Sequence, residues 1–141
     1  MKPNHILALI SRIREKANRF IVNELERRGI EGLVPSHGSI LVELLKHHEL
    51  PMKDLASMID KKKNTVTTLV DKLIKIGYIE KRSCDQDRRV SLISLTPKGR
   101  ALRPDFEAIS ERLNDKVYVD VNEEEKEVII NTLLQINKNL G

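Results

Sequence analysis

The stretch KKKNTVTTLVDKLIKIGYIEKRSCDQDRR, from Lys61 to Arg89, decides the fold. Three lysines lead into a segment whose apolar residues recur every three or four positions, which predicts an amphipathic helix that stops at Gly77. Two β-prone runs follow, Tyr78 to Arg82 and Val90 to Leu95, with a charged segment between them. The order of these signals predicts a helix and then a β-hairpin with a long polar tip.

Two further helices are expected before this stretch. Proline suits the first helical turn, so one helix should begin near Pro35 or Ser36 and end before Pro51. The segment MKDLASMI should form a short helix, followed by a turn at Asp60. It is expected to direct three apolar residues inward: Leu55, Met58 and Ile59. Two short helices joined by a tight turn, the second opening with polar and basic residues, predict a helix-turn-helix.

Both ends of the chain should be helical. The first helix should run from a cap at Asn4 to a stop at Gly29, with a long apolar stripe. Thr96 followed by Pro97 predicts another helix start, with a kink or late start at Pro104. The pattern of Asn122 and Glu125 predicts a capping box for a final apolar helix. These stripes exceed what a small domain needs, so they could contact a partner chain.

The charges are unevenly distributed along the 141 residues. Residues 61–100 hold eleven Lys or Arg against four Asp or Glu, whereas residues 101–141 hold five against nine. A basic block beside an acidic end favours a polyanionic partner for one face, although a mixed solvated surface would give a similar count. The single Cys84 excludes an intrachain disulfide, and no apolar run is long enough to cross a membrane. A cytoplasmic protein is predicted.

With these elements in place, the chain resembles the MarR family of winged-helix regulators over nearly its whole length. The resemblance rests on TVTTLVDKLIKIGYIEK, on Asp87 to Arg89 as an Asp-x-Arg wing motif, and on the LTPKG segment that begins at Leu95. It implies a mainly α fold with a small β-hairpin wing. Residues 34–100 would form the winged helix-turn-helix lobe, and residues 1–33 and 101–141 a helical dimerisation region. The sequence departs from the commonest family pattern at Asp60, Lys61, Lys62 and Thr68.

The resemblance also implies a function. The chain would be a homodimeric transcriptional regulator, most often a repressor, that binds a pseudo-palindromic operator in double-stranded DNA and is released by a small effector such as a phenolic compound. The alternative is a winged-helix module that docks an acidic protein partner. No glycine-rich phosphate loop, nucleophile elbow or suggestive carboxylate pair supports catalysis, so an enzyme is not expected.

Two groups of residues are candidates for DNA contact. A helix that enters the major groove presents the outer face of its first turns to base edges and phosphates. Here that face comprises Lys62, Lys63, Asn64, Thr65, Thr67 and Thr68, and Lys72, one turn further on, is expected to contact phosphate. In the wing, Arg89 suits a narrow minor groove, Asp87 would orient it through a bidentate pair, and Arg88 would contact phosphate. The alternatives are that Asp87 and Arg89 only rigidify the hairpin, or that Arg88 and Arg89 exchange their roles.

No metal or cofactor site is expected. His37, His47 and His48 lie in or near one helix, but their spacing does not suit a metal site, which favours histidines at the surface. Cys84 lies just before the wing tip, where its oxidation could disturb DNA contact. We expect Cys84 to be incidental and not a redox sensor.

Overall fold

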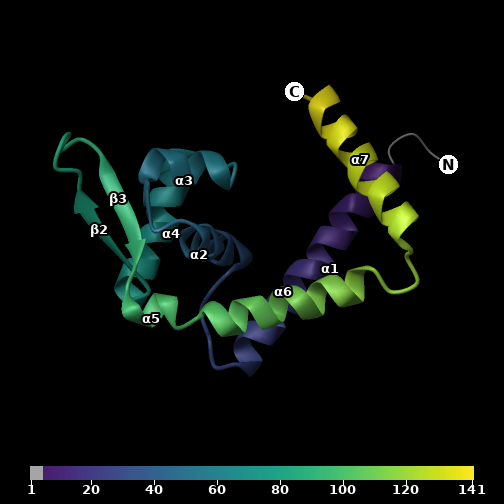
Figure 1. Ribbon diagram of the computed structural model, residues 1–141, viewed down its shortest axis with the longest axis horizontal. Coiled ribbons are helices and arrows are strands. Elements are labelled where there is room, and N and C mark those ends of the chain that lie inside the picture. Colours follow the sequence, from purple (N-terminus) through teal and green to yellow (C-terminus); the bar gives the residue numbers. More distant parts are fainter. Residues whose placement is uncertain (1–4) are drawn as a thin grey trace. The chain divides into compact units, whose positions relative to one another are not determined.

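The computed structural model describes residues 5–141, and the chain forms two compact units, one ending at Ile109 and the other spanning Ser110–Gly141. The fold is mainly helical with one small sheet (Figure 1). The elements follow in the order α1 (His5–Arg27), α2 (Pro35–Lys46), β1 (Glu49–Pro51), α3 (Met52–Met58), α4 (Lys63–Ile76), β2 (Ile79–Ser83), β3 (Ser91–Leu95), α5 (Pro97–Arg100), α6 (Arg103–Val117) and α7 (Glu123–Asn139).

Helix α1 ends at Arg27, and the predicted stop, Gly29, closes its end two residues later. The backbone of Gly29 has φ of +79°, and the Ile30 N–H donates to the Leu25 carbonyl at 2.9 Å. This left-handed glycine and the bond behind it satisfy carbonyls that the helix end leaves open. The predicted cap at Asn4 lies outside the described residues.

The helix-turn-helix of α3 and α4 is confirmed. Asp60 takes the left-handed conformation of the turn, with φ of +54°, which aspartate tolerates better than most residues. Helix α4 presents Val66, Val70 and Leu73 to the core, each with no exposed surface. It stops at Gly77, where φ is +97°. The DNA-binding candidates therefore lie on a helix whose opposite face is fully buried.

Helix α3 begins at Met52, and its inward face differs from the predicted one. Leu55 is fully buried, but Met58 is 45% exposed and Ile59 is only partly buried. Met52 and Ala56 occupy the buried positions instead, at 6% and 7% exposure. A helix of seven residues has fewer than two turns of periodicity, so its buried face is poorly determined by spacing alone.

The sheet has three strands rather than the predicted two. β1, Glu49–Pro51, pairs antiparallel with β3, and the strand order is β1-β3-β2. Leu50 of β1 lies opposite Ile93 of β3, and both are buried. Pro51 lies on an edge strand, the position where a missing N–H is tolerated. The sheet is thus anchored to the segment that joins α2 and α3.

Thr96 begins a helix as predicted, but the helix is interrupted. The Thr96 hydroxyl accepts a hydrogen bond from the Gly99 N–H at 3.1 Å and caps α5. α5 ends at Arg100, and α6 starts at Arg103, so the predicted kink near Pro104 is a break at residues 101–102. Leu102, Phe106 and Ile109 still join the buried core.

The second unit contains the end of α6 and helix α7. The predicted capping box is confirmed, because Asn122 accepts from the Glu125 N–H at 2.8 Å and Glu125 accepts from the Asn122 N–H at 3.1 Å. No residue of α7 is buried, and its large apolar side chains are exposed except Ile136, which is partly buried. Within the described residues, no helix is both long and apolar enough to span a membrane.

Candidate nucleic-acid interface

The first turns of α4 present the predicted polar face. Lys62 is the N-cap residue, and four consecutive side chains from Lys62 to Thr65 are exposed. Val66 follows and is fully buried, so the exposed run ends where the helix turns toward the core. The Asn64 side-chain oxygen accepts from the Thr65 N–H at 2.9 Å, so the amide N–H groups of this exposed side chain are not used in that bond.

The two threonines of the second turn are held by their own helix. The Thr67 hydroxyl donates to the Lys63 carbonyl at 2.9 Å, and the Thr68 hydroxyl donates to the Asn64 carbonyl at 3.2 Å. Each hydroxyl keeps acceptor lone pairs, and each methyl group is fixed by the bond. Thr68 is exposed, whereas Thr67 is partly buried, so Thr68 is the better placed of the two for an outside contact.

Lys72 has a different partner from the predicted phosphate. Its ammonium donates to the Gly32 carbonyl, which lies forty positions away in the α1–α2 connection. Lys72 therefore ties the middle of α4 to the segment before α2. The sequence could not show this contact, since nothing local to Lys72 or Gly32 indicates it.

The wing tip holds the ion pair expected from the Asp-x-Arg motif. The Arg89 Nε and Nη2 groups donate to the two Asp87 carboxylate oxygens, both at 3.1 Å, and the Arg89 backbone N–H donates to Asp87 Oδ1 at 3.0 Å. These bonds lower the pKa of Asp87, the side-chain bond with Arg89 contributing most. The Arg89 side chain remains 90% exposed, so its guanidinium is aimed without being covered. Arg88 is exposed beside it.

A second bidentate pair lies across the sheet and was not predicted. The Arg82 Nε and Nη2 groups donate to Glu49 at 3.0 and 2.9 Å, joining β2 to β1 over the central strand β3. The Glu49 bonds raise the pKa of Arg82 above its usual value. Only the position of β1 in the sheet reveals this pair, because the two residues are 33 positions apart.

His37 is buried, contrary to the expectation of surface histidines. Only 4% of it is exposed, and its Nδ1 accepts the Val34 N–H at 3.0 Å, which closes the start of α2. Burial, and then the charge of Lys72, lower the pKa of His37. Valine has no side-chain acceptor for an N–H of the first turn, and His37, the third helical residue, supplies only the reciprocal half of a capping box by accepting the N–H of the N-cap residue Val34.

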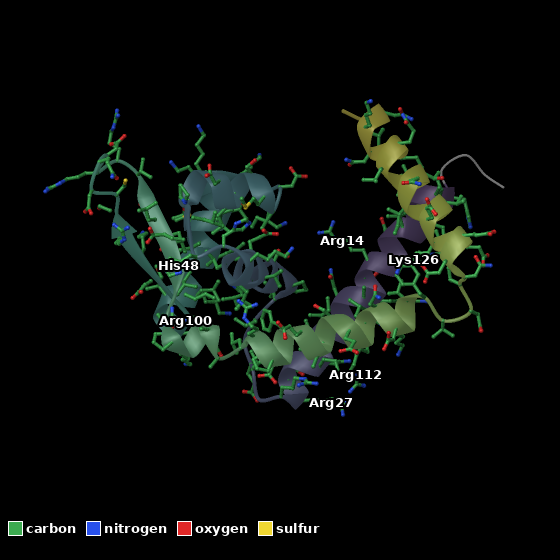
Figure 2. All side chains as sticks on the ribbon, in the orientation of Figure 1. Arg14, Arg27, His48, Arg100, Arg112 and Lys126 are labelled. Carbon is green, nitrogen blue, oxygen red and sulfur yellow. The ribbon has the colours of Figure 1, made fainter. Side chains whose placement is uncertain are left out.

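The remaining metal and redox candidates, His47, His48 and Cys84, do not form a shared site. His47 and His48 are exposed, and the Cys84 thiol lies 3.1 Å from the Gln86 side-chain oxygen. Among residues 5–141, no three His, Cys, Asp or Glu side chains gather closely enough to hold a metal ion. Figure 2 shows nitrogen-bearing side chains that project from the hairpin tip, where the predicted wing contacts are.

Helix α4, the antiparallel hairpin after it and the turn before it together define a winged helix-turn-helix. The family model for the MarR family matches residues 33–91, which cover α2 to the start of β3. The HTH-type transcriptional regulator BilQ of Clostridium symbiosum is 27% identical over 126 residues, or 89% of this chain and 85% of BilQ.

Solved structures share the fold. The S. aureus MepR–DNA complex superposes with a TM-score of 0.86 at 22% identity, covering 99% of this chain and 98% of that one. A MarR transcriptional regulator from Methanosarcina mazei Go1 gives a TM-score of 0.82 at 21% identity, covering 99% and 91%. Residues 33–91 thus match the MarR family model, and the fold of the chain is that of solved MarR-family winged-helix regulators.

Proposed function

We propose that this DNA-binding regulator acts as a homodimeric repressor of a pseudo-palindromic operator and is released by a small-molecule effector. The observation that carries the proposal is the Asp87–Arg89 pair. It fixes an almost fully exposed guanidinium at the end of a hairpin, beside a helix whose exposed face is polar and basic. Such a group suits the narrow, electronegative minor groove next to a major groove that holds the helix.

The contacts proposed for α4 and the wing follow from exposure. Lys62, Lys63, Asn64 and Thr65 would meet base edges and phosphates, and Thr68 would offer its methyl group to a thymine. Arg89 would enter the minor groove, with Asp87 as its positioning residue and Arg88 on phosphate. Lys72 has the weakest case for phosphate contact, because it already binds Gly32.

The proposed dimer is supported by apolar surface at both ends of the chain. Helix α1 exposes Leu7 and Ile13 at 54% each, and helix α7 exposes Val128 at 63% and Leu134 at 61%. Monomeric proteins rarely leave contiguous apolar patches of this kind in water. We therefore assign residues 1–33 and 101–141 to dimerisation and residues 34–100 to DNA binding, a division that also spaces two α4 helices on a palindrome.

Footprinting on the DNA upstream of the gene tests the proposal, combined with sedimentation to measure the oligomeric state. We expect a dimer that protects a palindromic site, with an affinity that falls steeply as salt rises. Binding that is indifferent to DNA sequence, or a monomer at micromolar concentration, would contradict it. Phenolic ligands added to the complex then test release, since an effector must bind the DNA-incompetent form more tightly.

A further inference from the structure

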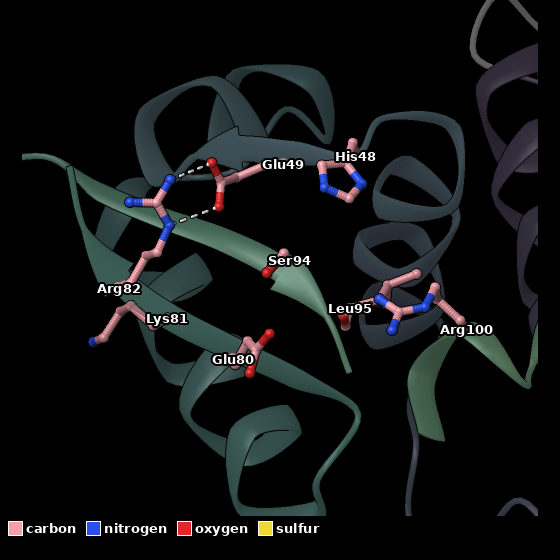
Figure 3. A pocket seen from close by; sticks show the side chains of 8 residues that line it. All are labelled: His48, Glu49, Glu80, Lys81, Arg82, Ser94, Leu95 and Arg100. Atoms are coloured by element: carbon pink, nitrogen blue, oxygen red, sulfur yellow. Dashed lines mark hydrogen bonds and ion pairs between the residues drawn. The ribbon is translucent and has the colours of Figure 1, made fainter. Parts of the chain in front are cut away.

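The ion pair between Arg82 and Glu49 ties the middle of the wing to the rest of the lobe. The Arg82 Nε and Nη2 groups donate to the two Glu49 carboxylate oxygens at 3.0 and 2.9 Å, and Figure 3 shows both bonds passing over β3. Within the described part of the chain, no other side-chain hydrogen bond or ion pair links residues 80–91 to a residue outside the wing. We call Arg82 and Glu49 the cross-sheet pair.

The cross-sheet pair lies where the hairpin leaves the three-stranded sheet. The last row with three strands joins Pro51 of β1, Leu92 of β3 and Arg82 of β2. One further row, in which Ser83 lies opposite Ser91, has two strands only, and the tip follows it. The pair therefore holds the wing at the last point where the lobe can support it.

Glu49 belongs to the well-packed part of the lobe. The next residue, Leu50, is buried and lies opposite the fully buried Ile93. Met52, which begins α3, is buried as well. Helix α3 leads through the turn at Asp60 into α4, so the carboxylate of Glu49 is attached to the same core on which α4 lies. The lobe end of the pair is therefore fixed.

The wing has little else to hold it at this height. Of the five residues of β2 only Ile79 is buried, and the four that follow it are exposed. Strand β1 has three residues and ends at Pro51, which has no N–H to donate to β3. An exposed ion pair adds little to stability as a rule, but a bidentate arginine–carboxylate pair fixes the relative position of its two ends.

From this arrangement we propose that the cross-sheet pair positions the wing for DNA binding, by preventing the hairpin from swinging away from the lobe so that Arg89 stays within reach of the minor groove. At about 3.3 Å per residue, the arms of residues 83–91 extend roughly 13 Å beyond the last three-stranded row, so a swing of about 10° moves the tip by about 2 Å. A binding group that is displaced by about 1 Å already loses much of its contact. The DNA-binding part rests on the proposed function, whereas the restraint on the wing does not.

Glu49→Gln separates this positioning role from a direct phosphate contact by Arg82. The change frees the Arg82 guanidinium and adds one net positive charge to the lobe. If Arg82 contacted phosphate, Glu49→Gln would therefore tighten DNA binding. If the pair positions the wing, the same change should weaken operator binding by about threefold or more, against the electrostatic trend.

Glu80→Gln is the matched control. Glu80 lies on the same face of the sheet as Glu49, in the row that also contains Ser94. Within the described residues, the Glu80 side chain makes no hydrogen bond or ion pair. Its substitution removes the same charge without freeing an arginine, so operator affinity should stay unchanged or rise slightly. Fluorescence-anisotropy titrations of the full-length variants at one salt concentration give these affinities.

The Arg89→Ala background shows whether the effect passes through Arg89. The proposed minor-groove contact is absent there, so Glu49→Gln should change the affinity by less than about twofold. A general structural defect would instead lower the affinity by the same factor in both backgrounds. Equal factors would overturn the positioning role, and so would unchanged or tighter operator binding by Glu49→Gln in the otherwise wild-type protein.

Nitrogen-15 relaxation of the protein without DNA tests the restraint itself. The backbone order parameters of residues 84–90 should fall in Glu49→Gln and in Arg82→Gln but not in Glu80→Gln, while those of α4 stay unchanged. Operator binding by the wild type with unchanged order parameters in both variants rejects only the cross-sheet pair. A wild type that binds no operator, together with the expected fall in order parameters, rejects the proposed function and leaves the restraint in place.

Discussion

The base and the tip of the wing are held by different kinds of contact. At the base, the Thr96 N–H donates to the Tyr78 carbonyl at 3.0 Å, and the Thr96 hydroxyl donates to the Gly77 carbonyl. The Lys98 ammonium donates to the Ile76 carbonyl at 2.8 Å and lies over the Tyr78 ring at 4.8 Å. At the tip, the described contacts of Arg89 are all with Asp87.

The base of the wing is therefore rigid, whereas the tip holds an exposed side chain with a single ion pair. The base joins the end of α4 to the start of α5 through backbone carbonyls and close packing, which salt and pH affect little. The tip relies on one exposed ion pair, which is weak on its own and screened by salt. The base therefore sets the angle between helix and wing, while the pair at the tip orients one exposed side chain.

Gly99→Ala should have the largest effect on stability, because it disrupts the close packing at the base of the wing. A Cβ on Gly99 would lie 2.1 Å from the Tyr78 carbonyl oxygen and 3.0 Å from Leu95, so the backbone would have to move. We expect a loss of about 3 kcal/mol or more in the free energy of unfolding, measured by urea denaturation.

Gly38→Ala is the matched control. Gly38 lies within α2, and a Cβ there meets nothing within 4 Å. The same change should stabilise the protein by about 0.5 to 1 kcal/mol, since alanine is the better helix former. If the two variants unfold alike, the close packing at the base is not what holds the wing.

Arg89→Ala tests the tip. It should weaken operator binding by about 1 to 3 kcal/mol and reduce the salt slope by about one, with urea unfolding unchanged. The measurement is a fluorescence-anisotropy titration at two salt concentrations. Identical curves for wild type and variant would remove Arg89 from the interface.

Asp87→Asn should have a smaller effect on the same assay. The guanidinium remains but loses its bidentate partner, so affinity should fall by roughly two- to fivefold, as expected for an exposed pair. Two opposing effects meet here, since removing a negative charge also favours the approach of DNA. Tighter binding by Asp87→Asn would show that orientation contributes less than repulsion.

The pH dependence of stability should come from His37 in α2 rather than from Asp87 at the wing tip. His37 has a lowered pKa, so the folded state favours its neutral form. Its contribution to stability is present above about pH 6.5, the ordinary value, and is lost as pH falls through the lower folded value. The pKa of Asp87 is lowered from 3.8, so its pair persists over this range.

Thermal unfolding of His37→Gln between pH 7 and pH 5 checks this. The wild type should lose melting temperature on acidification, and the variant should lose less of it. The Asp87→Asn variant should follow the wild type. A wild-type melting temperature that does not change over this range would contradict a role for the buried imidazole.

Local signals in the sequence predicted most of the fold. Gly29 and Gly77 mark helix ends because only a left-handed residue closes them so readily, and Asn122 with Glu125 forms its capping box within one turn. The strand β1 was missed because it has three residues and pairs only with a strand more than forty positions away. The inward face of α3 was misassigned for the same lack of length.

In the candidate site, too, contacts between residues close in the sequence could be predicted and contacts between distant residues could not. The Asp87–Arg89 pair could be predicted because its partners are two positions apart, whereas Lys72–Gly32 and Arg82–Glu49 join residues that are forty and 33 positions apart. The burial of His37 could not be predicted either, since it depends on the core that α2 packs against. The predicted DNA contacts themselves remain predictions.

The Thr96 hydroxyl bond to Gly77 makes the wing a closed loop, with both ends fastened at one point. The segment between residues 83 and 91 can then be exchanged or lengthened without disturbing α4, because doubling a loop costs only about 0.6 kcal/mol in closure entropy. The tip of the wing can therefore be replaced without changing the rest of the lobe. Under the proposed wing contact, grafting a different tip between residues 83 and 91 would alter which groove shapes the protein selects, while the Thr96–Gly77 bond keeps the lobe stable.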